Sequence, residues 1–292
     1  MEPSRLTRRI SRSVQTTVGW IFWDPGAVTR YEGLGIPQPF SGPGGYIAAR
    51  CAPLAPAGPD AVIAAFGSIS PIGVGRVFEL LGSTDRFADF WQARDEAVIE
   101  GLRSFSPSIA APLEQFGPEL WAVVDELPAV GRVLFAACRA MPRPSDRLLS
   151  GWHALNCIRE WRGDTHWAIT VANGLDHAQS SILHNEWLRY ETDWLPLSRG
   201  TSAEDIEAGW DALTSMGLAA DRRITPAGVE LRQRIEDETD RICSLPWRIL
   251  GEARTLELAE LLEPPCEILL RRVDETAGVN YQPASRMHPH IG

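Results

Sequence analysis

The sequence predicts a mainly α, multi-helical fold. Apolar side chains recur with helical spacing in most segments, and almost no segment alternates apolar and polar residues with the period of two that marks a strand. Clusters of proline and glycine divide the chain into pieces of helix length. With 292 residues and an apolar content of 44%, the chain can bury a large core.

Residues 1–145 are predicted to form an N-terminal helical domain. It opens with a short basic helix and an aromatic cluster at residues 20–23, and the Gly- and Pro-rich stretch Pro37–Gly45 then predicts a loop. Further helices are predicted over residues 46–54, 60–66, 72–81 and 85–105. Four prolines punctuate the helices that follow, namely Pro112, Pro118, Pro128 and Pro142.

Residues 146–250 are predicted as a winged-helix-like domain that carries the candidate site. A helix is predicted over residues 148–161, with a break at Arg162–His166 and a second helical stretch downstream. Ser202 begins a later helix that Gly217 ends, and a very short extended wing then leads into a return helix. Residues 251–292 are predicted as a C-terminal helix and tail.

Composition excludes several classes of protein. All 28 basic residues are arginine, so a Schiff-base lysine and a Walker-type phosphate loop are excluded. The five cysteines are far apart and odd in number, which predicts core residues rather than disulfides or a zinc site. No apolar run is long enough to span a bilayer and the basic start lacks a signal core, so we expect a cytoplasmic protein without a membrane partner. The net charge of −10 argues against broad contact with nucleic acid.

Chemistry-bearing residues concentrate between Gly151 and Glu191, which holds four of the six histidines and four of the eleven tryptophans. Helical spacing aligns His153, Glu160 and Asp164 on one face, where a histidine and two carboxylates can share a proton. The predicted catalytic residues are His166, Asp164, Glu160 and His153.

The Arg162–His166 stretch has two interpretations. Asp164 caps the next helix while Arg162 pairs with a carboxylate such as Glu160. Alternatively, Asp164 orients His166 as a general acid or base near neutral pH, and Arg162 neutralises a substrate oxyanion or carboxylate.

The same region has the composition of a pocket for a flat or greasy ligand, because tryptophans alternate with polar groups. The polar residues that follow His166 at helical spacing form either a solvated helix face or the wall of a groove. A metal is not expected, because His166 and His177 would lie roughly 16 Å apart on a straight helix, and no cofactor is expected. The predicted binding residues here are Arg162, Trp152, Trp161, Trp167, Asn173, His177 and His184.

Two motif sets carry a family resemblance. Leu213 to Gly217, Asp221-Arg-Arg223 and Ile224-Thr-Pro-Ala-Gly228 resemble the recognition helix and wing of a MarR-type winged helix. The segment from Gly45 to Leu54, the Arg-Gly-Asp-x-His run and Ile235-Glu-x-x-Thr-Asp240 are together similar to an actinobacterial family of helix-turn-helix proteins.

The chain departs from that family in two places. It has Phe66-Gly-Ser-Ile-Ser-Pro71 in place of a more polar segment, and Val18 in place of a histidine. Such changes would enlarge a pocket and suit a specialised ligand. The predicted binding residues also include Tyr46, Arg50 and Phe66.

The charge of the predicted recognition helix decides between two functions. Residues 203–216 carry four acids and no base, which would repel DNA. The sequence therefore favours a cofactor-independent acid/base enzyme acting on a hydrophobic or aromatic small molecule in natural-product metabolism, by cyclisation, elimination, isomerisation or hydrolysis. The alternative is a ligand-responsive, MarR-like transcriptional regulator or drug-binding protein, for which a homodimer would match two DNA half-sites.

Overall fold

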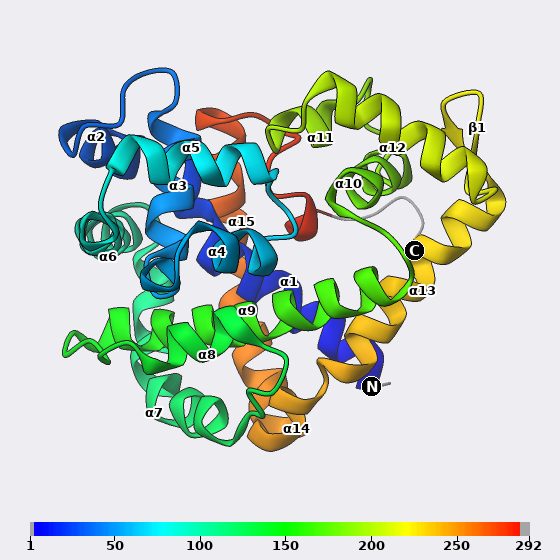
Figure 1. Ribbon diagram of the computed structural model, residues 1–292. Helices are drawn as coiled ribbons and strands as arrows, with labels where there is room; N and C mark the ends of the chain where they lie inside the picture. Colours follow the sequence, from blue (N-terminus) through cyan, green and yellow to red (C-terminus); the bar gives the residue numbers. More distant parts are fainter. Residues whose placement is uncertain (1–2, 287–292) are drawn as a thin grey trace.

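The computed structural model describes residues 3–286, with side chains from Arg5 onward (Figure 1). Within this range the chain is mainly helical and carries a two-stranded antiparallel sheet, so the predicted mainly α fold is confirmed. The first helices are α1 (Pro3–Gly19), α2 (Pro25–Gly33), α3 (Ser41–Cys51), α4 (Pro59–Ala65), α5 (Pro71–Leu81), α6 (Phe87–Phe105), α7 (Ala110–Glu126) and α8 (Val133–Ala140). The remaining elements are α9 (Arg147–Ala172), α10 (His177–Trp187), α11 (Trp194–Ser198), α12 (Ala203–Ser215), β1 (Ala219–Ala220), β2 (Arg223–Ile224), α13 (Pro226–Ile242), α14 (Leu245–Leu250) and α15 (Glu252–Thr276).

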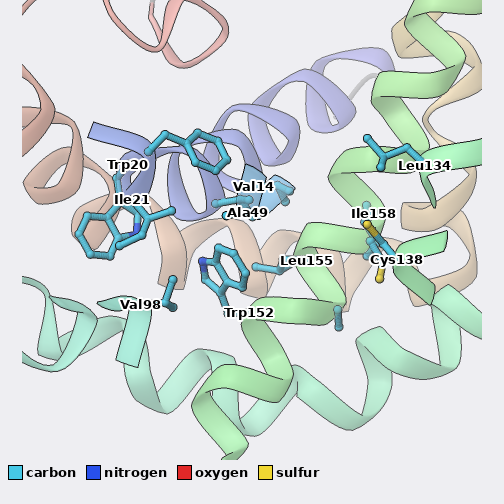
Figure 2. Close-up of a cluster of buried hydrophobic side chains, with 14 of the residues drawn as sticks. Val14, Trp20, Ile21, Ala49, Val98, Leu134, Cys138, Trp152, Leu155 and Ile158 are labelled. Atoms are coloured by element: carbon cyan, nitrogen blue, oxygen red, sulfur yellow. The ribbon is translucent and has the colours of Figure 1, made fainter. Parts of the chain in front are cut away.

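The larger hydrophobic core surrounds the first half of α9, which packs against α1, α6, α7 and α8. Helices α1 and α15 lie side by side although they come from opposite ends of the described chain. Figure 2 shows part of this core, in which Trp152 of α9 meets residues of α1 and α6. The Trp152 indole is fully buried and donates to the carbonyl of Thr17 at 2.8 Å, which satisfies its polar atom.

Helices α7 and α9 approach each other backbone to backbone. A Cβ atom at Gly151 would lie 2.1 Å from the carbonyl oxygen of Leu113, and one at Gly117 would lie 3.4 Å from the Cα of Gly151. Next to this crossing, the Trp121 indole donates to the carbonyl of Ser150 at 3.1 Å. Only glycine at position 151 permits this packing, because any larger residue would push the helices apart.

Residues 175–242, which we call the α10–α13 unit, have a smaller hydrophobic core of their own. Between α12 and α13 the chain forms the β1–β2 hairpin, whose turn residues Asp221 and Arg222 have φ values of 50° and 55°. Gly228 lies where a Cβ atom would be 2.3 Å from the carbonyl oxygen of Leu218, so α13 can begin directly against the hairpin. The core of the unit consists of Leu175, Ile182, Leu183, Ile206, Trp210, Leu213, Leu218, Ala219, Leu231 and Ile235.

Several connections join the α10–α13 unit to the larger core, and three of them are the following. The chain leaves α9 through Gly174, which has a φ of 77°, and returns through α13, which packs against α9 and α1. The third connection is a pair of hydrogen bonds from Ser70. Its backbone N–H donates to the backbone carbonyl of Arg199 at 3.0 Å, and its hydroxyl donates to the backbone carbonyl of Gly200 at 2.6 Å. The unit is therefore attached to the rest of the protein both through α13 and through the loop after α11.

Two predicted local structures are wrong. The predicted loop Pro37–Gly45 already belongs to α3 from Ser41 onward, because its glycines let the helix lie close to the rings of Phe40 and Tyr31. The predicted break at Arg162–His166 does not exist, since α9 runs without interruption to Ala172. A single glycine is tolerated inside a helix that its neighbours bury.

The predicted division into domains over residues 1–145, 146–250 and 251–292 stays a prediction. Residues 1–2 and the last part of the predicted tail, residues 287–292, lie outside the described residues. Among the helices that are described, none combines the length and apolarity needed to cross a membrane.

Candidate functional site

A cavity of about 1060 Å³ lies between the larger core and the α10–α13 unit. Its described walls come from α1 and α3, from the second half of α9, from α10, α11 and α13, and from the chain after α15. This volume is at the upper end of that found for small-molecule sites in proteins. The cavity is therefore large enough for a sizeable organic ligand.

Charge and aromatic rings dominate the cavity lining. Ten arginines but only three acids are among the described lining residues, in a chain whose net charge is −10. The arginines are Arg5, Arg8, Arg9, Arg12, Arg50, Arg159, Arg162, Arg199, Arg232 and Arg286, and the acids are Glu236, Asp240 and Glu263. The aromatic residues are Phe22, Trp23, Phe40, Tyr46, Trp161, Trp167, Trp194, Trp247 and Tyr281.

Glu160 holds two arginines at one end of the cavity. Arg50 binds the Glu160 carboxylate through two hydrogen bonds of 3.0 and 2.7 Å, and Arg159 binds the same carboxylate at 2.5 Å. Arg50 also donates to the Tyr46 hydroxyl at 2.9 Å. Burial raises the pKa of the Glu160 carboxyl, but the two guanidinium groups outweigh it and hold that pKa below its usual range.

Arg199 adds a third guanidinium to this end from the α10–α13 side. It donates to the carbonyl of Ser68 at 3.0 Å, and no carboxylate of the described residues forms an ion pair with it. Burial lowers the pKa of Arg199, and repulsion from Arg50 and Arg159 lowers it further. For Tyr46, burial raises the pKa, but the three guanidinium groups outweigh it, so the net shift is downward. This end of the cavity carries an uncompensated positive charge.

At the other end, α13 supplies an ion-pair network. Arg162 contacts Asp240 at 2.9 Å and Glu236 at 3.3 Å, and Arg232 contacts Glu236 at 2.6 Å. One terminal nitrogen of Arg162 and one of Arg232 are buried without a hydrogen-bond partner in the described structure.

His166 lies beside this network as a neutral side chain. Its Nδ1 lies 3.1 Å from the Thr239 hydroxyl, which itself donates to the carbonyl of Ile235 at 2.6 Å. The proton is therefore on Nδ1 of His166, which leaves Nε2 as an acceptor. Burial lowers the pKa of His166 to about 4. The imidazole is uncharged at neutral pH.

The structure brings only part of the predicted site to the cavity. The predicted residues that line it are Tyr46, Arg50, Trp161, Arg162, His166, Trp167 and His184. Those that are not among its described lining residues are His153, Glu160, Asp164, Trp152, Phe66, Asn173 and His177. Phe66 still contacts the site, because its ring lies 4.4 Å from the guanidinium carbon of Arg50.

The residues on the predicted catalytic stripe bind separate partners. His153 pairs with Asp95 at 2.9 Å, Glu160 binds arginines, and Asp164 accepts the backbone N–H of Phe135 at 2.9 Å. These partners come from different elements around α9, so the side chains do not share a proton. The expected pairing of Asp164 with His166 is absent, because residues two apart on a continuous helix point in different directions.

Two of the predicted polar binding residues, Asn173 and His177, are not among the described residues that line the cavity. The Asn173 amide donates to the carbonyl of Ile169 in its own helix at 2.9 Å. His177 begins α10, and its Nε2 is buried without a hydrogen-bond partner in the described structure. Within residues 3–286, no group of three His, Cys, Asp or Glu side chains is placed to hold a metal ion.

Sequence reasoning missed the arginines that define the cavity, among them Arg159, Arg199 and Arg232. One signal was present, because the α1 arginines at positions 5, 8, 9 and 12 have the spacing of a single helix face. Arg199 gave none, since it lies in a loop whose position depends on the tertiary fold.

We expect Asp164→Asn to change how stability depends on pH. Burial raises the pKa of the Asp164 carboxyl to about 7, although the N–H groups of Phe135 and Leu134 lower it. A raised acid pKa makes the wild type lose stability as pH rises from about 4 to about 7, whereas asparagine keeps the acceptor oxygen without the charge. Near pH 8 the variant should be more stable by up to about 4 kcal/mol, and near pH 4 the two should be equal. Urea unfolding across this range measures the difference, and parallel curves would refute it.

The outward face of the α10–α13 unit is acidic. Glu204, Glu207 and Asp211 of α12 are exposed. Arg222 in the hairpin binds Glu207 at 2.7 Å and Asp193 at 2.8 Å, and Arg223 contacts Glu186 at 3.4 Å. The basic residues of the hairpin are thus held by acids of the same unit.

The described chain is thus a mainly helical body with a ligand-sized cavity and a smaller helical unit that carries a short hairpin between α12 and α13. The chain belongs to the helix-turn-helix family, whose sequence pattern matches residues 7–274. The comparison with curated proteins found no match, and the comparison with solved structures found none either.

Family membership corrects the predicted function. It covers nearly the whole chain and points to a DNA-binding regulator, so the preference for an acid/base enzyme of natural-product metabolism was wrong. The helix-turn-helix part of the resemblance is confirmed, and its MarR-like and actinobacterial parts stay predictions.

Proposed function

We propose that this protein is a cytoplasmic, ligand-responsive transcriptional regulator of the MarR-like winged-helix kind. The observation that carries the proposal is the position of the cavity between the larger core and the α10–α13 unit. A small molecule bound there would contact both parts. Its binding would therefore favour one arrangement of the DNA-binding unit over another.

Helix α13 supports this coupling. Its first half contributes Leu231 and Ile235 to the smaller core, and the helix also packs against α9 and α1. The same helix lines the cavity with Arg232, Glu236 and Asp240. A ligand that binds these groups acts on the helix that follows the hairpin directly.

The acidic face of α12 gives the regulator a low affinity for DNA while Arg222 stays bound to Glu207. DNA affinity depends on positive charge that meets phosphates, and an arginine already paired with a carboxylate contributes little. In the proposed mechanism, DNA binding requires the release of Arg222 from its acidic partners.

We expect Glu207→Gln to tighten DNA binding about three- to ten-fold. The change removes one negative charge from the DNA-facing surface and weakens the hold on Arg222. Because one more phosphate contact forms, the slope of log K against log salt should steepen by about one. Fluorescence anisotropy with duplexes selected from a random DNA pool measures both quantities.

Glu230→Gln is the matched control for this experiment. Glu230 is exposed and pairs with Arg234 on α13, so its change alters the net charge equally without touching the hairpin. Equal effects of the two variants would show that net charge alone acts and would contradict the role of Arg222.

The proposed function as a whole is tested in two steps. Duplexes that bind the wild-type protein are first selected, and their affinity is then measured by anisotropy with and without a saturating concentration of a ligand that binds the cavity. A change in DNA affinity of at least about five-fold is expected, as for a coupling free energy of about 1 kcal/mol. Light scattering then measures whether a homodimer forms, as half-sites 34–36 Å apart would require. Failure to select any duplex, or an affinity that the ligand leaves unchanged, would refute the proposal.

A further inference from the structure

The charge of the cavity identifies the chemical class of its ligand. We propose that the ligand is an organic anion whose oxyanion group, a carboxylate, phosphate or sulfate, is bound by Arg199 together with Arg50, Arg159 and the Tyr46 hydroxyl. The inference deepens the proposed function, because it names the ligand of the same cavity. It rests on the geometry of these four side chains rather than on the DNA-binding step.

The balance of charge at this end favours an anion. Three guanidinium groups face one carboxylate, Glu160, which already accepts from both Arg50 and Arg159. The guanidinium group of Arg199 has only the backbone carbonyl of Ser68 as its hydrogen-bond partner in the described structure. An incoming oxyanion would relieve the repulsion among the three cations and provide Arg199 with a charged partner.

The four groups are already in place for this role. The side chains of Arg50 and Arg159 are 10% and 12% exposed, and their shared carboxylate fixes their positions. Tyr46 is 8% exposed, and its hydroxyl both accepts from Arg50 and can donate to a ligand. A site built from held side chains loses little conformational entropy when it binds an anion.

The walls beside this site fit an apolar or aromatic body on the same ligand. The tilted rings of Tyr46 and Phe22 pack together with their centroids 4.0 Å apart, and Trp23 and Trp194 both pack against Tyr281. All of these residues line the cavity. An inorganic ion would leave this surface unused, so the aromatic walls favour an organic anion.

The anion would also connect the two parts of the protein. Arg199 follows α11 of the α10–α13 unit, whereas Tyr46, Arg50 and Arg159 lie on α3 and α9. Without an anion their like charges repel across the interface. With one bound, the same groups would draw the unit toward the larger core.

A pair of fluorescent probes tests the inference. 8-Anilinonaphthalene-1-sulfonate carries a sulfonate, and N-phenyl-1-naphthylamine is its neutral counterpart, so their dissociation constants isolate the effect of the charge. We expect the wild type to bind the sulfonate at least about ten-fold more tightly, as for a charge-assisted hydrogen bond. Arg199→Gln should weaken sulfonate binding by about ten- to a hundred-fold and leave the neutral probe within about two-fold.

Arg12→Gln is the matched control, because Arg12 lines the same cavity but is already paired with Glu267 at 2.7 Å. Its change should alter binding of the sulfonate by less than about two-fold. Equal losses in the two variants, or equal affinities of the wild type for both probes, would overturn the inference. The wild-type comparison keeps the test valid where Arg199→Gln does not fold.

Competition separates an organic anion from a free inorganic one. We expect 2-naphthoate to displace the sulfonate probe at concentrations far below those of 2-naphthamide or inorganic phosphate. Displacement by phosphate as effective as by naphthoate would refute an organic ligand. The probe experiments contain no DNA, so their outcome is independent of DNA binding. If the cavity prefers anions but a bound anion leaves DNA affinity unchanged, only the proposed function is refuted. If the cavity binds charged and neutral probes equally, only the inference is refuted.

Discussion

Replacing Glu160 with alanine is expected to lower the free energy of unfolding by about 3–5 kcal/mol. The Glu160 side chain is 1% exposed and is the carboxylate that neutralises both Arg50 and Arg159. Its removal leaves two guanidinium groups confined at the cavity with no charge to balance them, and truncation of one partner in a buried ion pair has a large cost. Urea or thermal unfolding at neutral pH measures the effect.

The pH dependence of this effect has a definite sign. The pKa of the Glu160 carboxyl is lowered in the folded state, so its contribution to stability is present above the pKa of the unfolded chain. That contribution is lost as pH falls through the lowered, folded-state pKa. The difference between wild type and variant should therefore shrink in acid.

Glu119→Ala provides the control for burial. The Glu119 carboxylate accepts two hydrogen bonds from Arg254, so it too is paired with arginine. Unlike Glu160 and its arginines, this pair is near the surface, because Glu119 is 43% exposed and Arg254 is 33% exposed. Because solvent screens this pair, its loss should lower stability by about 1 kcal/mol or less. If Glu160→Ala has no larger effect than Glu119→Ala, the buried network does not stabilise the fold as we infer.

The second large effect is expected for Gly151→Ala, which should lower the free energy of unfolding by about 3 kcal/mol. The added methyl group would lie 2.1 Å from the backbone oxygen of Leu113, and backbone cannot rotate away as a side chain can. Helices α7 and α9 would have to separate, which disturbs the packing of Trp121 on Ser150. Thermal unfolding measures the loss.

Gly163→Ala is the control on the same helix. A Cβ atom at Gly163 would meet only an oxygen of Glu160, at 3.6 Å, which is an ordinary contact. Since alanine has the higher helix propensity, this variant should be more stable by about 0.5–1 kcal/mol. A loss of stability equal to that of Gly151→Ala would mean that the helix tolerates no alanine at either position, and that the close crossing is not the cause.

The sequence predicts the fold better than the site, for reasons that particular residues illustrate. Helical periodicity and the capping residues near Ser202 and Gly217 are local signals, and the elements they predict lie where expected. The predicted break at Arg162–His166 was wrong because burial of α9 on several helices outweighs the propensity of one glycine. Which helices bury α9 cannot be predicted from the sequence of that segment alone.

The candidate site depends even more on distant contacts. Arg50 and Glu160 are 110 residues apart, and Arg199 reaches the same end of the cavity from a third segment. Spacing along one helix placed His153, Glu160 and Asp164 on a common face, but each then binds a different neighbouring element. Which neighbours these are is decided by tertiary packing, and no periodicity in the sequence encodes it.

In the proposed mechanism, helix α13 would transmit movement from the cavity to the hairpin. It begins at the hairpin and passes the cavity, and it has 17 residues, which makes it about 25 Å long. A rotation of about 10° around its packed end would move its other end by about 4 Å, somewhat less than the rise of about 5.4 Å for one helical turn. A displacement of less than 1 Å where a ligand binds would therefore be magnified several-fold at the hairpin, enough to bring Arg222 within or beyond reach of a phosphate.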